Sequence, residues 1–213
     1  MVEPWPLEEE QEVASFRIGE LVRMRMRSPR TGCTHTFYEL RFTDWVNVVA
    51  VTEDERVLLV RQFRAGSRTV TLEIPGGLVE PGEDPLVAAR RELREETGYE
   101  AAEWRVLGVV RPNPAIQGNR CHTFLALGAR RTSEPQLEAA EDIDLVPTPL
   151  AEIPGLVERG AIDHTLVLSA FLRLWLAGGA AEALAAAGAR ATGRTSPPGT
   201  MSRPVHPHRK GSA

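Results

Sequence analysis

Three glutamates, Glu92, Glu95 and Glu96, stand close together in the sequence. An α-helix turns by about 100° per residue, so on a helix all three side chains would share one face. Like charges at this spacing repel, and neighbouring arginines relieve the repulsion only in part. A solvated charged face is one interpretation. A divalent cation bound among the carboxylates explains the crowding more economically.

A cation at this place indicates phosphate chemistry. Mg²⁺ prefers carboxylate and carbonyl oxygens, keeps several waters and bridges to substrate phosphates. The formal net charge is −4, and residues 188–213 are basic, so the acidic excess lies in the rest of the chain. Such a body argues against nucleic acid as the main partner, because phosphate backbones are held by Lys and Arg. It suits a small phosphate substrate when cations lie between the two.

The residues around the glutamates complete a longer pattern: Gly, five residues, Glu, seven residues, then Arg-Glu-apolar-any-Glu-Glu-any-Gly-apolar. Its nine positions are filled by Gly77, Glu83, Arg91, Glu92, Leu93, Glu95, Glu96, Gly98 and Tyr99. In this pattern the sequence resembles the Nudix hydrolases, whose signature it is. The one departure is Tyr99, which stands where an aliphatic residue is usual and leaves the chemistry untouched.

The resemblance implies a site for Mg²⁺ or Mn²⁺. The expected ligands are Glu92 and Glu96, helped by Glu95 and by a backbone carbonyl where Gly76 and Gly77 turn. Glycines suit this place, since they let the backbone approach an ion without a side chain intruding.

Two further residues of the signature have expected roles. Arg91 is placed with Glu95 in the catalytic group, and together with Glu83 it is expected to brace the loop, because a guanidinium holds carboxylates by paired hydrogen bonds. A metal-binding role for Glu83 is the alternative.

Residues outside the signature indicate the substrate. Pro114 lies fifteen residues beyond Tyr99, and "LLVRQFR" and "LEIPGG" precede or enter the signature. These features look like the ADP-ribose pyrophosphatase subgroup. The resemblance implies that Arg64 approaches the substrate's phosphates or terminal ribose, with a surface or dimer-contact arginine as the alternative. It also implies that Glu73 holds a ribose or an arginine.

Two later loops supply the remaining candidates. In the subgroup a loop after the later strands delivers an acid that positions or deprotonates the attacking water, and Glu141 aligns best, with Glu138 as the substitute. In "NPAIQGNRCHTF" the sequence departs from the subgroup, because Ala115 replaces a glycine and Asn119 stands near the place of an acid. Asn119 is expected to bind the substrate's phosphate, sugar or base.

These residues predict metal-dependent hydrolysis of the diphosphate of ADP-ribose or a related nucleoside diphosphate sugar, giving a nucleoside monophosphate and a sugar phosphate. Another Nudix substrate is the main alternative: a nucleoside triphosphate, a dinucleoside polyphosphate or a capped RNA. A non-catalytic nucleotide sensor is a third. The small-molecule substrate is the expected partner, together with a second copy in a homodimer, an analogy with the subgroup.

The elements that must position the site follow from local pattern. A helix is expected from Asp84 to Thr97, with Asp84 as N-cap, Pro85 in the first turn and Gly98 ending it. Strand-like segments precede and follow it, and helical segments come last. This order predicts an α/β (α+β) class, with a mixed β-sheet sandwiched between helices, as in the Nudix fold.

Three regions are expected along the chain. Residues 1–44 form an N-terminal strand region, a possible dimer-swapping arm, whose acidic start at 1–13 is predicted to fray. Residues 45–178 form the Nudix domain, and 179–213 a disordered tail rich in Pro, Gly, Ser and Arg.

Composition and cysteine spacing bear on the compartment. No apolar run reaches membrane-spanning length, and the N-terminus is acidic where a signal peptide would be basic and then apolar. Cys33 and Cys121 stand far apart, which gives neither a zinc pattern nor a disulfide framework. A cytoplasmic protein with two reduced thiols is therefore predicted.

Overall fold

The computed structural model describes residues 1–139 and 141–178. The tail that the sequence predicts to be disordered, residues 179–213, lies outside these described residues. Within the described ranges, no helix is both long and apolar enough to cross a lipid bilayer.

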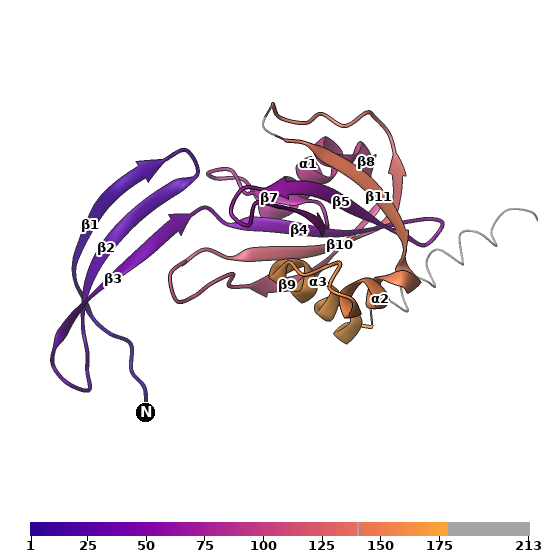
Figure 1. Ribbon diagram of the computed structural model, residues 1–213. Helices are drawn as coiled ribbons and strands as arrows, with labels where there is room; N and C mark the ends of the chain where they lie inside the picture. The colour runs from indigo at the N-terminus through magenta and orange to yellow at the C-terminus, as the bar shows by residue number, and fades with distance from the viewer. Residues whose placement is uncertain (140, 179–213) are drawn as a thin grey trace, which may run out of the picture.

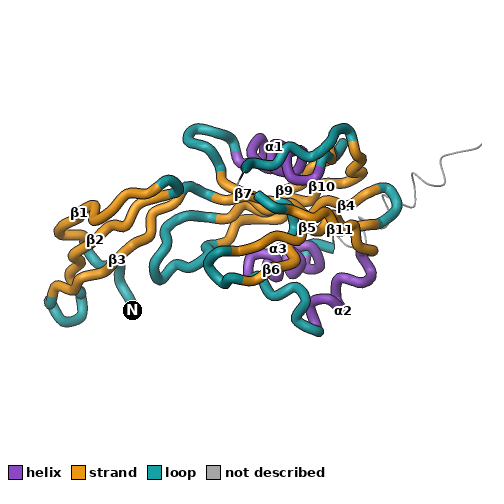
Figure 2. Tube along the Cα trace, turned by 45° about the horizontal axis from the view of Figure 1, so that its top comes forward, coloured by secondary structure: helices purple, strands orange, loops and turns teal. Residues whose placement is uncertain are grey.

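The N-terminal region forms its own three-stranded antiparallel sheet. The strands are β1 (Leu7–Phe16), β2 (Gly19–Arg27) and β3 (Thr34–Phe42), hydrogen-bonded in that order. This sheet projects from one side of the rest of the chain (Figures 1 and 2). The expectation of a frayed start is wrong, because β1 begins at Leu7 and pairs with β2 along its length. The role of this region as a dimer arm stays a prediction.

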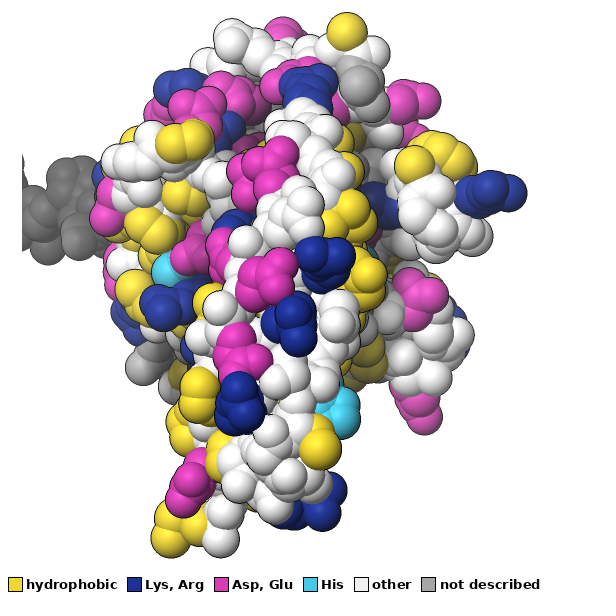
Figure 3. All heavy atoms as spheres, turned by 90° about the vertical axis from the view of Figure 1, so that its left-hand side faces the viewer, with side chains coloured by type: hydrophobic (Ala, Val, Ile, Leu, Met, Phe, Trp, Pro, Cys, Tyr) yellow, Lys and Arg dark blue, Asp and Glu magenta, His cyan; other side chains and the backbone are white. Residues whose placement is uncertain are grey.

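Opposite charges help to hold the acidic strand β1. Its ten residues are all exposed, so burial contributes little to its position. Instead, Glu9 pairs with Arg23 and Arg25 at 3.4 and 3.3 Å, and Glu10 pairs with Arg41 at 3.0 Å. Figure 3 views the molecule from this side and shows basic and acidic side chains interspersed on its surface. Cross-strand ion pairs and the backbone ladder thus order a segment whose composition alone predicted disorder.

A larger mixed sheet forms the centre of the molecule. Its backbone order is β11-β5-β4-β10-β8, with β6 paired to β5, β7 to β4 and β9 to β10. The pairing of β4 with β10 is parallel and the other pairings are antiparallel. The strands are β4 (Trp45–Thr52), β5 (Arg56–Arg64), β6 (Thr69–Glu73), β7 (Gly76–Leu78), β8 (Tyr99–Glu100), β9 (Glu103–Val110), β10 (Cys121–Arg131) and β11 (Ile143–Pro149).

Helices cover both faces of this sheet (Figures 1 and 2). On one face α1 (Pro85–Thr97) packs through Leu93 against Val48 and Phe124. The other face is covered by the short 3₁₀ helix η1 (Leu150–Glu152), α2 (Ile153–Glu158) and α3 (Thr165–Leu176). Successive residues of a strand point to opposite faces, so the apolar run of β4 serves both cores. The expected sheet between helices is confirmed.

The helix α1 begins and ends as the sequence predicts. The side chain of Asp84 accepts a hydrogen bond from the Leu86 N–H at 2.8 Å, and Pro85 occupies the first turn. Gly98 ends the helix with a φ of 73°, and its N–H donates to the Arg94 carbonyl. A Cβ on Gly98 would lie 2.2 Å from the Ser133 carbonyl oxygen, so both conformation and space require glycine. These caps fix the register of the glutamates on the helix.

The sequence did not indicate several of the strands, among them β7 and β11. β7 has only three residues, and β11 contains two prolines, which depress strand propensity. β11 pairs only with β5, at the end of the strand order, where Pro147 is tolerated because an edge strand does not need every N–H in its ladder. Both strands matter for the site, since β7 lies beside α1 and β11 ends the loop that carries Glu141.

The two cysteines are free thiols, as expected, and their environments differ. Cys33 is exposed, whereas Cys121 is buried, and burial together with the charge of Asp44 raises its pKa to about 12. At pH 8 a thiol with that pKa is only about 0.01% thiolate, the reactive form.

We expect iodoacetamide at pH 8 to alkylate one thiol per folded chain, and Cys33→Ser to abolish this labelling until denaturant is added. Mass spectrometry would count the labels, and rapid labelling of folded Cys33→Ser would contradict the burial of Cys121.

Candidate active site

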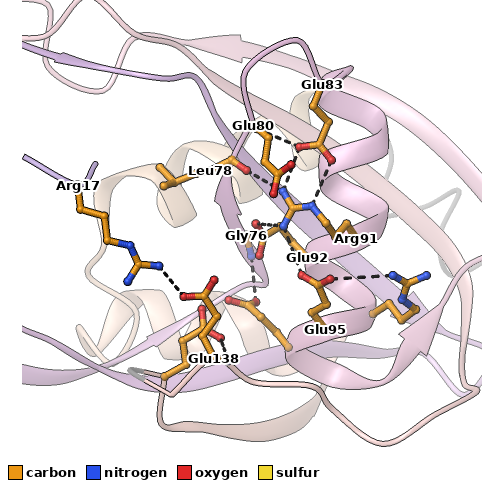
Figure 4. Close-up of polar contacts among 12 residues, drawn as sticks. Arg17, Gly76, Leu78, Glu80, Glu83, Arg91, Glu92, Glu95 and Glu138 are labelled. Carbon is orange, nitrogen blue, oxygen red and sulfur yellow. Dashed lines mark hydrogen bonds and ion pairs between the residues drawn. The ribbon is translucent and has the colours of Figure 1, made fainter. Parts of the chain in front are cut away.

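The acidic face of α1 lies against β7 (Figure 4). β7 pairs with β4, with Asn47 opposite Gly76, and this pairing brings the two glycines beside the helix. The Gly76 N–H donates a hydrogen bond to Glu96 Oε2 at 3.1 Å. A Cβ on Gly77 would lie 2.4 Å from Glu92 Oε1, so glycine leaves the space that the Glu92 carboxylate occupies. The structure thus brings together four residues of the predicted site, Gly76, Gly77, Glu92 and Glu96.

Arg91 ties this face to the preceding loop. Its guanidinium donates to both oxygens of Glu83 at 3.1 Å and to the Leu78 carbonyl at 3.0 Å. It also donates to Glu92 at 2.8 Å and to Glu95 at 3.3 Å. One planar side chain therefore fixes residues 78–83 on the helix and sets the carboxylate positions, which agrees with the expected bracing role. The Glu83 carboxylate accepts a further hydrogen bond from the Glu80 N–H, so it faces the loop.

Two of the glutamates are buried. Glu92 is 9% exposed and Glu96 is 4% exposed. Burial, and then repulsion by the Glu92 carboxylate, raises the pKa of Glu96 well above its usual value. Burial also raises the pKa of Glu92, although the Arg91 charge opposes the change. A cation bound between these two carboxylates would offset the cost of ionising both of them, so the pair favours a cation site.

The donor set fits a magnesium-like ion. Among the described residues, no three His, Cys, Asp or Glu side chains converge into a ready-made metal cluster. Mg²⁺ does not require one, since it commonly takes one or two carboxylates and completes its shell with waters and substrate phosphates. Glu92 and Glu96 supply two carboxylates, and the neighbouring glycines let both approach the backbone of β7, since the Gly76 N–H donates to Glu96 and a side chain on Gly77 would displace Glu92.

Arg64 and Glu73 form a bidentate ion pair. Arg64 Nε and Nη2 each donate to a Glu73 oxygen at 2.7 Å, and the Thr71 hydroxyl donates to Glu73 at 2.6 Å. The Glu73 side chain is 4% exposed, whereas that of Arg64 is 42% exposed. Of the two expected partners of Glu73, the structure shows an arginine. The hydrogen bonds to Glu73 raise the pKa of Arg64, and the charges of Glu96 and Glu141 add to the rise, so Arg64 stays charged on the side of the acidic face.

Glu141 and Glu138 form a turn with reciprocal hydrogen bonds. The Glu138 N–H donates to Glu141 Oε2 at 2.9 Å, and the Glu141 N–H donates to the Glu138 carbonyl at 2.9 Å. The Gln136 N–H of the same loop donates to the Glu95 carbonyl at 2.7 Å, which holds the loop against α1. After burial, the charge of Glu141 adds to the rise in the pKa of Glu92 and Glu96. The Glu138 carboxylate instead accepts a hydrogen bond from Arg17 at 3.0 Å (Figure 4). Glu141 is therefore the better placed of the two acids.

Asn119 lies where the loop before β10 meets the segment between β3 and β4. It is 5% exposed, and its Nδ2 donates to the Thr43 carbonyl at 3.1 Å, which ties the start of β10 to the segment between β3 and β4. Its Oδ1 is buried without a hydrogen-bond partner in the described part of the chain. None of the contacts recorded for Asn119 joins it to the acidic face, so its expected role in substrate binding stays a prediction.

Two contributors to the site were not found from the sequence. The Leu78 carbonyl holds Arg91, and Arg17 reaches Glu138 across 121 positions of the chain. A backbone carbonyl has no side-chain signature. Arg17 stands in a turn of a separate sheet, and neither composition nor spacing relates it to Glu138.

The chain is similar to known proteins in sequence. The family described as NUDIX domain matches residues 42–170. A methanol dehydrogenase activator from Bacillus methanolicus is 32% identical over 132 residues, which are 61% of this chain and 71% of that protein. An ADP-ribose pyrophosphatase from Bacillus subtilis (strain 168) is 34% identical over 114 residues, which are 53% of this chain and 62% of the relative.

The fold is also found among solved structures. A crystal structure of an ADP compounds hydrolase superposes with a TM-score of 0.74 at 23% identity, covering 84% of this chain and 97% of that one. The family match spans more than half of the chain and includes the signature, the Arg64–Glu73 pair and Glu141. These comparisons agree with the expected class of enzyme, a Nudix pyrophosphatase. The chain belongs to the Nudix family.

Proposed function

We propose that this protein hydrolyses the diphosphate of ADP-ribose or a closely related nucleoside diphosphate sugar, with Mg²⁺ or Mn²⁺ as cofactor. The observation that carries the proposal is the buried pair Glu92 and Glu96 beside the glycines of β7, where burial and mutual repulsion favour a cation. The similarity to an ADP-ribose pyrophosphatase supports this substrate class.

In this proposal the acidic face of α1 holds the metal. Glu92 and Glu96 are the carboxylate ligands and Glu95 assists them, while Gly76 and Gly77 let the ligand carboxylates lie against β7. When bound, a divalent cation neutralises the diphosphate, polarises its P–O bonds and lowers the pKa of coordinated water. Arg91 keeps the ligand carboxylates in place by its hydrogen bonds, which is how it serves catalysis.

Glu141 acts as the general base. A carboxylate near the metal ligands can accept the proton of the attacking water while the water oxygen forms a bond to phosphorus. The bond between that phosphorus and the bridging oxygen breaks, and the departing phosphate keeps the electron pair. The products are a nucleoside monophosphate and a sugar phosphate.

Two further residues are proposed to bind the substrate, Arg64 beside the acidic face and Asn119 at the start of β10. Arg64, held by Glu73, presents a half-exposed guanidinium to the phosphates or the terminal ribose. Asn119 has one unpartnered acceptor, Oδ1, which would take a hydrogen bond from a sugar hydroxyl or a base amine.

Product identification tests this proposal. We expect the purified protein with Mg²⁺ or Mn²⁺ in ¹⁸O water to convert ADP-ribose into AMP and ribose 5-phosphate, with one ¹⁸O in one of the two products by mass spectrometry. Chelation of the metal by EDTA should abolish turnover, and readdition should restore it. A parallel panel contains a nucleoside triphosphate, a dinucleoside polyphosphate and a capped RNA. Cleavage of one of these, with nucleoside diphosphate sugars untouched, would replace the proposed substrate.

A further inference from the structure

A side chain of the N-terminal sheet reaches the loop that carries the general base. Arg17 lies in the turn between β1 and β2, and its Nη2 is 3.0 Å from Glu138 Oε2. Figure 4 shows the two side chains pointing toward one another from elements far apart in sequence. Both are largely exposed, at 81% and 65%, so the pair is accessible to substitution without disturbing a core.

Glu138 transmits this contact to Glu141. Its N–H donates to Glu141 Oε2 at 2.9 Å, and its carbonyl accepts the Glu141 N–H at 2.9 Å. Because these two hydrogen bonds link the residues, a change in the position of Glu138 also moves the Glu141 carboxylate. The same loop already lies against α1, because the Gln136 N–H donates to the Glu95 carbonyl at 2.7 Å.

We propose that Arg17 is a positioning residue for hydrolysis, which holds the Glu138–Glu141 turn over the acidic face by its ion pair with Glu138. This inference rests on the proposed function. The guanidinium occupies the Glu138 carboxylate and leaves Glu141 as the acid that meets the attacking water. It also adds a positive charge next to a group of carboxylates that would otherwise repel one another. The N-terminal sheet thereby contributes to the reaction centre of the same chain.

The size of the effect follows from the exposure of the pair. Exposed ion pairs contribute little to the stability of a protein, so the fold should not depend on Arg17. A small change in the position of a base still lowers the rate. For a pair of this kind we expect a decrease in kcat of about 2- to 5-fold at low salt, and a smaller decrease when salt screens the charges.

The test is a charge exchange. Arg17→Glu, Glu138→Arg and the double variant are compared with the wild-type chain, using ADP-ribose and Mg²⁺ at low and high salt. Arg25→Glu is the matched control, because Arg25 lies in the same sheet and pairs only locally, with Glu9. Millisecond hydrogen–deuterium exchange over residues 132–142, measured without metal or substrate, gives a readout that does not depend on activity.

Each single variant should lower kcat with KM changed by less than about 2-fold, and should speed amide exchange in residues 132–142. The double variant should recover both readouts, and the control should match the wild type. Three results would overturn the inference: unchanged kcat and exchange in Arg17→Glu, no recovery in the double variant, or a rise in KM at constant kcat, which would make Arg17 a substrate ligand. If the wild-type chain cleaves no nucleoside diphosphate sugar, the proposed function itself is overturned.

Discussion

Replacing Glu96 with glutamine is expected to lower the turnover of ADP-ribose by about three orders of magnitude while the protein stays folded. A metal acting as a Lewis acid contributes several kcal/mol to catalysis, and each 1.36 kcal/mol is tenfold in rate. The glutamine oxygen can still accept the hydrogen bond from the Gly76 N–H, so the local geometry is kept. The measurements are kcat with saturating ADP-ribose and Mg²⁺, and circular dichroism to confirm the fold.

The same substitution should stabilise the metal-free protein above neutral pH. The folded-state pKa of Glu96 is raised, so its contribution to stability is present at low pH and is lost as pH rises through that pKa. Glutamine stays neutral and avoids this loss. At pH 8 with EDTA we expect the melting temperature of Glu96→Gln to exceed that of the wild type by at least about 2 °C, the shift that roughly 1 kcal/mol produces in a chain of this size. Near pH 4 the difference should vanish.

Other carboxylates do not confuse this comparison. Burial acts to raise the pKa of Glu73, but hydrogen bonds from Arg64 and Thr71 outweigh it and lower the pKa. The hydrogen bonds from Arg91 lower the pKa of Glu83, so both carboxylates lose their contribution to stability as pH falls. Wild type and variant share these groups, and their difference isolates Glu96. Glu100→Gln, an exposed change of the same charge, is the control and should behave as wild type. Normal turnover in Glu96→Gln would refute the metal site.

The signature was predictable because it is local. Asp84, Pro85 and Gly98 specify where α1 begins and ends, and the 3.6-residue period then fixes which side chains share a face. The sheet class followed from the alternation of strand-like and helical segments. Both rest on interactions between residues a few positions apart, which a sequence shows directly.

The missing parts depend on long-range contacts. β7 is too short to show a period, and it forms because β4 offers it a partner. β1 looked frayed because its acidic side chains find their arginines on β2 and β3 only after the sheet assembles. Arg17 and Glu138 are 121 positions apart, so no local sequence pattern indicates their contact. The sequence therefore indicates the local elements better than the long-range contacts between them.

Substituting Arg91 with alanine should destabilise the protein more than any exposed change on the same helix. Arg91 is 23% exposed, and its guanidinium satisfies two partly buried carboxylates, Glu83 and Glu92, as well as the Leu78 carbonyl. Removing one partner of such a buried network leaves unpaired charge and costs about 2–4 kcal/mol. For a chain of this size that corresponds to a decrease in melting temperature of about 4–16 °C, measured by calorimetry without metal.

Arg94→Ala is the matched control for this prediction. Arg94 lies on the same helix, is 51% exposed and forms one long ion pair among the described residues, with Glu95 at 4.0 Å, so its loss should change stability by less than about 0.5 kcal/mol. Arg91→Lys should fall between the two, because an ammonium cannot supply the planar fork that grips Glu83 with two hydrogen bonds. If Arg91→Ala melts like Arg94→Ala, the network adds no stability. If saturating Mg²⁺ raises the melting temperature of Arg91→Ala by more than it raises that of the wild type, cation and guanidinium neutralise the same carboxylates, of which Glu92 is one that Arg91 contacts.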